Sequence, residues 1–199
     1  MFEKELFRLH KEMLQYNIYN PDDNQDFNLV MFRNIILNAS ILREYKWLED
    51  FVGKYSGKVN PEYRDAICNY SYALVSFGNG NFESALGFIS KIKFDLYLYK
   101  LDVKTLLLKI YYELGYSDQL FSAADATDHY LRTTNEIPES LKILVKNFIK
   151  YLKELVKLKL RNKISRNDAD YLCKSIERNK SIGSREWLIE KAQSILIRN

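Results

Sequence analysis

Residues that break helices are scarce in this chain. Its 199 residues include only seven glycines and three prolines, about half or less of the usual share. So few breakers argue against an all-β fold with many turns, and against the glycine-rich loops of nucleotide-binding α/β folds. Apolar residues, at 47%, suffice to bury a core. The composition therefore predicts an all-α fold.

Apolar residues recur at spacings of three and four along most of the sequence, the period of an amphipathic helix. The pattern predicts about ten helices joined by short loops, so that successive helices are antiparallel neighbours. The first, over about 2–19, carries a single apolar stripe that we expect to pack on the next helix. The members of this stripe are Phe2, Leu6, Leu9, Met13 and Tyr16.

Capping residues mark the expected helix ends. Residues 21–24, Pro-Asp-Asp-Asn, form a break with N-cap chemistry before a helix over about 24–40. Asn60 and Pro61 supply a cap and a first helical residue, and residues 78–81, Gly-Asn-Gly-Asn, form a tight turn. Ser165 and Asp168 have the spacing of a capping box before a ninth helix.

The sequence repeats with a period of 34 residues. The segment from Ala73 to Leu86 has a small residue in its first helix, glycine before an aromatic at the turn, and Glu-x-Ala-Leu in its second helix. It resembles the tetratricopeptide repeat (TPR), whose helix–turn–helix unit has this length. A degenerate copy follows, in which Leu107 aligns with Ala73, Tyr111 with Phe77 and Tyr116 with Phe82. A third, weaker copy, with Trp47 at its turn, lies before the segment from Ala73 to Leu86.

This resemblance covers residues of about 43–133 and implies a TPR-like right-handed solenoid of antiparallel helix hairpins that binds a protein or peptide in a concave groove. We expect one domain over 1–199, with N-terminal capping helices at 1–41, repeats at 42–133 and basic C-terminal helices at 134–199. Helices at both ends would act as caps, because the exposed ends of a stack need covering.

Positive charge is concentrated near the C-terminus. Residues 142–180 carry a net charge of +8, whereas residues 1–141 carry −5. The helix expected over about 138–161 has an apolar stripe that includes Phe148, Leu152 and Leu155. It places lysines on a face opposite or beside this stripe, at spacings of three and four. Such a face fits nucleic-acid phosphates, an acidic protein or anionic lipid surface, or simple solvation near a helix C-terminus. The lysines are Lys142, Lys146, Lys150, Lys153 and Lys157.

A cluster of aromatic residues lies between positions 94 and 116, at Phe94, Tyr97, Tyr99, Tyr111, Tyr112 and Tyr116. They fit either a recognition surface, where rigid rings are good anchors, or the core of the hairpins. The candidate binding residues are thus Tyr97 and Tyr112, with Lys146, Lys150, Lys153 and Lys157.

The sequence contains no nucleophile elbow, metalloprotease helix, P-loop or dinucleotide fingerprint. Asp125 and His129 share a helix face, which fits a solvated ion pair better than a metal site. Cys68 and Cys173 fit buried thiols in a reducing compartment, and neither a signal peptide nor a membrane span is apparent. The sequence predicts a cytoplasmic, non-catalytic protein-interaction module without cofactor or metal. The alternative is a nucleic-acid-associated helical protein that binds phosphates through the basic face of residues 142–166.

Overall fold

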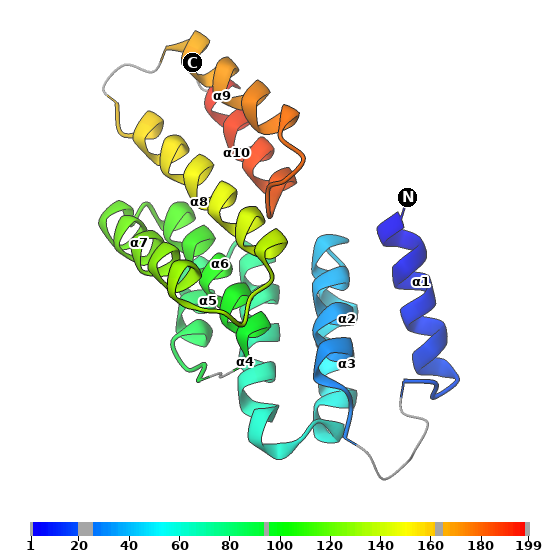
Figure 1. Ribbon diagram of the computed structural model, residues 1–199. Helices are drawn as coiled ribbons and strands as arrows, with labels where there is room; N and C mark the ends of the chain where they lie inside the picture. The colour runs from blue at the N-terminus through cyan, green and yellow to red at the C-terminus, as the bar shows by residue number, and fades with distance from the viewer. Residues whose placement is uncertain (1, 20–25, 94–95, 162–164, 198–199) are drawn as a thin grey trace. The chain divides into compact units, whose positions relative to one another are not determined.

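The computed structural model describes residues 2–19, 26–93, 96–161 and 165–197 (Figure 1). Within these ranges the chain is helical and contains no strand, which confirms the all-α prediction. The elements are α1 (Phe2–Gln15), α2 (Leu29–Ile41), α3 (Tyr45–Tyr55), the 3₁₀ segment η1 (Ser56–Lys58), α4 (Pro61–Gly78), α5 (Phe82–Ile89), α6 (Tyr97–Leu114), α7 (Ser117–Thr133), α8 (Glu139–Lys159), α9 (Arg166–Arg178) and α10 (Arg185–Ile197).

The chain divides into two compact units, unit 1 (Met1–Ile110) and unit 2 (Tyr111–Asn199), and each is described by itself. Unit 1 holds α1 to α5 and most of α6, and unit 2 holds α7 to α10. The single domain expected over 1–199, with its three parts, stays a prediction.

Aromatic rings form the centre of unit 1. Phe32 is wholly buried, and its ring lies 4.7 Å from that of Phe51 and 5.4 Å from that of Phe27. Tyr19 stacks on Phe27 at 4.6 Å and meets Tyr55 edge-on at 5.4 Å. Such pairs add to the free energy gained by burying the rings. The cluster joins α3 to the start of α2 and to the segment that follows α1.

The helix α1 docks on this core through a different face from the one expected. Its buried residues are Phe7, His10 and Leu14. The ring of Phe7 meets Trp47 of α3 edge-on at 4.7 Å, and the side-chain amide of Asn38 in α2 donates a hydrogen bond to the Glu3 carboxylate at 2.7 Å. The helix thus packs on the next helix, α2, as expected, but the expected stripe is not its buried face, because Phe2, Leu9 and Tyr16 are exposed. Both sets of residues have helical spacing, so periodicity alone does not choose between them.

Two helix ends near the N-terminus also differ from expectation. α1 stops at Gln15 rather than near residue 19, because Asn17 adopts a left-handed φ of 55° and the amide of Ile18 donates to the Met13 carbonyl at 2.9 Å. α2 starts at Leu29 rather than near residue 24, and its N-cap is Asn28. The break expected over 21–24 lies outside the described residues.

The predicted start of α4 is confirmed. Asn60 is its N-cap and accepts a hydrogen bond from the amide of Glu62 at 3.0 Å, and Pro61 is the first helical residue. α9 begins at Arg166 with Ser165 as its N-cap, but the Ser165 side chain makes no capping hydrogen bond. The expected capping box is thus absent there.

The turn between α4 and α5 depends on glycine. Gly80 has a φ of +78°, a conformation that costs an L side chain about 1–2 kcal/mol. Its amide donates to the Phe77 carbonyl at 3.1 Å. Gly115, at the end of α6, has a φ of +75° and donates to the Tyr112 carbonyl at 3.3 Å. The two turns of the sequence repeat therefore end their helices in the same way.

The aromatic residues on either side of these turns also correspond. The rings of Phe77 and Phe82 lie 5.4 Å apart, and those of Tyr111 and Tyr116 lie 6.4 Å apart. Ala85, in the second helix of the first hairpin, is wholly buried, as expected for a small residue at a close helix contact. α4 and α5 contact each other along this hairpin.

The helix α8 is central to unit 2, where it contacts α7, α9 and α10, and Figure 1 shows α9 and α10 running alongside each other. Phe148, Leu152 and Leu155 of its predicted apolar stripe are wholly buried. Trp187 of α10 lies 6.3 Å from Phe148 and 5.3 Å from Tyr112. Unit 2 therefore has a largely aliphatic core with one tryptophan.

Candidate interaction surfaces

The lysine stripe of α8 is partly used inside unit 2. Lys142 has a side chain only 12% exposed, and its ammonium donates a hydrogen bond to the Thr134 carbonyl at 2.8 Å. Lys153 forms an ion pair with Asp125 of α7 at 2.5 Å. This contact lowers the pKa of the Asp125 carboxyl, through the hydrogen bond and the charge of Lys153. Two of the five lysines thus hold α8 to its own neighbours.

The remaining lysines differ in their surroundings. Lys146 is half-buried, whereas Lys150 and Lys157 are exposed. The Lys150 ammonium lies 5.4 Å from the centre of the Tyr151 ring. Lys157 borders a hollow of about 360 Å³ between α8 and α9, which Arg161 and the carboxylates Glu154 and Asp168 also line. The surface here carries both signs of charge.

The two candidate tyrosines lie in different environments. Tyr97, at the start of α6, is half-buried. Tyr112 is 4% exposed, packs against Trp187, and has the Lys159 ammonium 4.5 Å from its ring centre. Tyr112 is therefore a core residue of unit 2 and not an exposed contact. The structure places Tyr97 in unit 1 and Tyr112 in unit 2, and Phe94 of the same sequence cluster lies outside the described residues.

A groove in unit 1 was not predicted from the sequence. It has a volume of about 580 Å³ and lies between α1 with its following turn on one side and α3 with η1 on the other. Three lysines line it, Lys11, Lys54 and Lys58, against one carboxylate, Asp50. All three lysines are exposed, so the groove presents a net positive charge at neutral pH.

Aromatic rings lie beneath these lysines. The Lys11 ammonium is 4.8 Å from the centre of the Phe7 ring, and the Lys54 ammonium is 5.2 Å from that of Tyr55. Lys58 donates a hydrogen bond to the Tyr19 hydroxyl at 2.8 Å. Cations over aromatic faces are held in place by the ring quadrupole. These contacts thus restrict the positions of the three ammonium groups.

Sequence reasoning missed this groove because its parts come from separate segments. Trp47, Phe51 and Tyr55 have helical spacing, which indicates a core face, and Lys54 stands one position before Tyr55. The one local signal was the occurrence of lysines beside these aromatic residues. The contribution of Lys11 from α1 depends on how α1 docks, and the periodicity of α1 indicated a different face.

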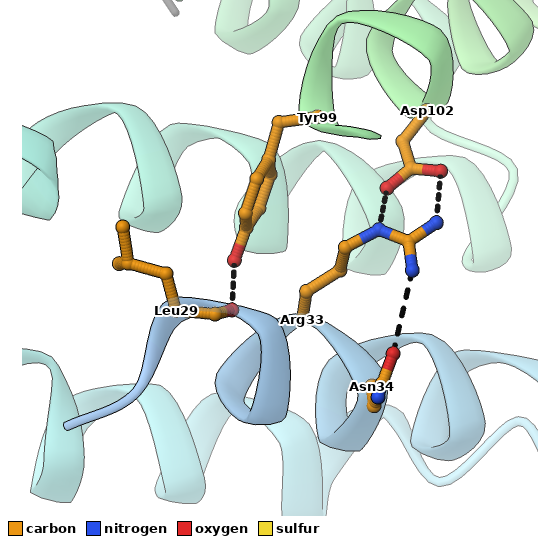
Figure 2. Close-up of polar contacts among 5 residues, drawn as sticks. All are labelled: Leu29, Arg33, Asn34, Tyr99 and Asp102. Atoms are coloured by element: carbon orange, nitrogen blue, oxygen red, sulfur yellow. Dashed lines mark hydrogen bonds and ion pairs between the residues drawn. The ribbon is translucent and has the colours of Figure 1, made fainter. Parts of the chain in front are cut away.

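The strongest polar cluster of unit 1 joins α2 to α6. Figure 2 shows the guanidinium of Arg33 making a two-pronged ion pair with the Asp102 carboxylate, with the second hydrogen bond at 2.8 Å. Arg33 also donates to the Asn34 side chain at 3.3 Å, and the Tyr99 hydroxyl donates to the Leu29 carbonyl at 2.9 Å. The side chains of Arg33 and Asp102 are 18% and 14% exposed. We call this pair the α2–α6 clamp.

Burial shifts the titration of groups around this clamp. The pKa of Asp102 is raised by desolvation, which outweighs the opposing effect of Arg33. Desolvation also raises the pKa of Tyr70 and Tyr99, and it lowers the pKa of Lys109 to about 8 against the opposing charge of Asp102. All four groups belong to unit 1. A carboxylate paired this fully with Arg33 is best explained as a contact that holds α2 to α6.

Other candidate chemistry is limited in the described part of the chain. No group of three or more His, Cys, Asp or Glu side chains could hold a metal ion there. His129 is exposed, and Asp125, which shares its helix face, pairs with Lys153 instead. Cys173 is buried as expected, and Cys68 is half-buried. No described helix is long and apolar enough to cross a membrane.

Comparisons with known proteins add no further assignment. No family model, no curated protein and no solved structure matches this chain.

Proposed function

We propose that this chain is a cytoplasmic, non-catalytic protein-interaction module, built as a TPR-like right-handed solenoid of helix hairpins with further helices at its ends. The matching glycine turns and aromatic pairs around Gly80 and Gly115 support the repeat architecture. The observation that carries the function is the groove between α1 and α3. Its three lysines and aromatic floor suit an acidic segment of a protein partner.

Charge and shape both support a protein segment as the ligand. Carboxylates of a partner would pair with Lys11 and Lys54, and charge complementarity of this kind sets specificity and association rate. A volume of about 580 Å³ accommodates several side chains of an extended segment. Phe51 and Tyr55 are nearly buried, at 3% and 7% exposed, and Trp47 already stacks on Phe51 at 5.4 Å. Rings packed in this way leave little free face for the bases of a nucleic acid.

The test is affinity purification of the tagged protein from lysate treated with nuclease, followed by titration with each purified partner. We expect a protein partner that binds the wild type and is lost with Lys11→Glu/Lys54→Glu. Both lysines are exposed, so this variant should keep its fold. The matched control is Lys150→Glu/Lys157→Glu, which makes the same charge change in unit 2 and should leave binding intact. If Lys11→Glu/Lys54→Glu binds the partner as tightly as the wild type does, the assignment of the groove is contradicted.

The second candidate is nucleic-acid binding through the basic face of residues 142–166. Lys150, Lys157 and Arg161 are exposed on the C-terminal half of α8 and just beyond it, which favours this reading. Phosphate binding weakens steeply with salt. A labelled single-stranded oligonucleotide that binds at low salt, and that is released by Lys150→Glu/Lys157→Glu but not by Lys11→Glu/Lys54→Glu, would support it.

A further inference from the structure

The helix α1 has a second apolar face that is exposed within unit 1. Its members alternate at spacings of four and three, which is the heptad pattern of a seam between two helices. Three of them are highly exposed: Phe2 at 73%, Leu9 at 50% and Tyr16 at 68%. Leu6 and Met13 lie between them and are half-buried. We call these five residues the α1 outer stripe.

The other face of α1 is already occupied. Phe7, His10 and Leu14 are buried, and Glu3 accepts the hydrogen bond from Asn38 of α2. The α1 outer stripe is therefore not the face through which α1 packs on the rest of unit 1. A helix that merely capped a stack would present a polar outer face, and contiguous exposed apolar residues mark an interaction surface.

The charged residues beside the α1 outer stripe indicate which kind of partner can cover it. On its open side, the stripe is bordered by Glu5 and Glu12, with Arg8 between them in ion pairs at 3.2 Å and 3.1 Å. This border has a net charge of −1 at neutral pH. A helix with lysine or arginine beside its own apolar seam would complement it, as charges at seam-flanking positions do in coiled coils.

A second copy of α1 fits this border poorly. In an antiparallel pair, Glu5 of each copy would face Glu12 of the other, and like charges repel. In a parallel pair, the opposite border would have to come from Glu3 and His10, which already face α2.

We propose that the α1 outer stripe docks a single amphipathic helix of a partner protein, with apolar residues at heptad spacing and basic residues beside them. The stripe is about 21 Å long, at 1.5 Å for each helical residue, which matches roughly two heptads of such a helix. This surface is separate from the groove between α1 and α3. It shares with the proposed function only the claim that a partner is a protein.

The test uses two labelled synthetic helices of about three heptads, identical except that lysine or glutamate flanks a leucine seam. We expect fluorescence anisotropy to show that the lysine peptide binds the full chain, and that Leu9→Glu/Tyr16→Glu weakens it about tenfold or more. Tyr171→Glu, at a residue that is 75% exposed on α9, is the matched control and should change nothing.

A charge swap sharpens the test. The variant Glu5→Lys/Arg8→Glu/Glu12→Lys keeps both ion pairs within α1 but reverses the sign of the border. It should reverse the preference, so that the glutamate peptide binds about as well as the lysine peptide binds the wild type. A photo-crosslinking lysine peptide, mapped by mass spectrometry on the wild type, should mark α1 even if a variant fails to fold.

Several outcomes would overturn the proposal. They are equal binding of both peptides, crosslinks that map away from α1, and binding that survives Leu9→Glu/Tyr16→Glu. A dimer in sedimentation equilibrium that this variant abolishes would assign the stripe to a second copy, and vesicle binding that it abolishes would assign it to a membrane. Lys11→Glu/Lys54→Glu should leave the lysine peptide bound, so a failure of the groove assignment is distinguishable from a failure here.

Discussion

Each unit has a largely buried ion pair, Arg33 with Asp102 in unit 1 and Lys191 with Glu113 in unit 2. Unit 2 also has pairs nearer the surface, such as Lys153 with Asp125. The centre of unit 1 is aromatic, whereas that of unit 2 is mostly aliphatic. A buried pair fixes two helices in one geometry but depends on both partners, whereas an exposed pair contributes little and is easily replaced. The basic sequence of unit 2 was the more conspicuous, but the two-pronged ion pair, between Arg33 and Asp102, lies in unit 1.

The two tryptophans allow each unit to be followed separately. Trp47 belongs to unit 1 and Trp187 to unit 2. The variant Trp187→Phe therefore reports on unit 1 alone, and Trp47→Phe reports on unit 2 alone. Urea unfolding of these two backgrounds, followed by fluorescence, measures the effects predicted below.

The largest expected difference concerns the α2–α6 clamp. Asp102→Ala leaves the Arg33 guanidinium buried without its carboxylate, and loss of one partner of a buried pair costs about 3–5 kcal/mol of unfolding free energy. Asp125→Ala, which removes the exposed partner of Lys153 in unit 2, should lower the unfolding free energy far less, because solvent screens an exposed pair. The double variant Arg33→Met/Asp102→Leu should recover most of the loss in unit 1. Equal losses for Asp102→Ala and Asp125→Ala would remove the distinction between the buried pair and the exposed one.

A close approach in unit 1 gives the next effect. A Cβ atom added at Gly78 would collide with the Tyr45 ring at the start of α3. Gly78→Ala should therefore cost about 1–3 kcal/mol of unfolding free energy in unit 1, as overpacking does. Adding Tyr45→Ala removes the obstructing ring, so Gly78→Ala should cost much less in that background. An unchanged cost there would mean that the clash with Tyr45 is not its cause.

The two glycine turns test whether the units share a repeat. Gly80 in unit 1 and Gly115 in unit 2 both have positive φ, and an added Cβ would meet no atom within 4 Å at either position. Gly80→Ala and Gly115→Ala should therefore each cost about 1–2 kcal/mol, from backbone strain alone. Each loss should be seen by the tryptophan of its own unit. A loss at only one of the two turns would argue against their equivalence.

The sequence was sufficient to predict features that depend only on residues close together along the chain. The cap at Asn60 and Pro61, the turn at Gly80 and the apolar stripe of α8 are local patterns, and all are confirmed. It was insufficient where distant segments meet. Asp102 lies 69 positions from Arg33, and the pairing of Lys153 with Asp125 requires α7 and α8 to be placed first.

The helix α1 shows a second limit of prediction from the sequence. Two of its faces have helical apolar spacing, and the choice between them depends on the aromatic partners that Trp47 and its neighbours supply. Periodicity identifies an apolar face but not the surface that covers it. The groove and the exposure of the α1 outer stripe both follow from that choice, so neither could be predicted, although the sequence did identify the five residues of the stripe.

The smallest expected effect is a pH dependence confined to unit 1. Burial lowers the pKa of His10 below its ordinary 6.5, against the opposing effects of Asn38 and Glu3. The unfolded chain then binds a proton at this histidine more readily than the folded chain does, so the contribution of His10 to stability is retained above pH 6.5 and declines as the pH falls below it. In the Trp187→Phe background, the unfolding free energy should fall more between pH 8 and pH 5 with His10 than with His10→Leu. Identical pH profiles would show that α1 does not bury this histidine in solution, and would also remove the basis for an exposed α1 outer stripe.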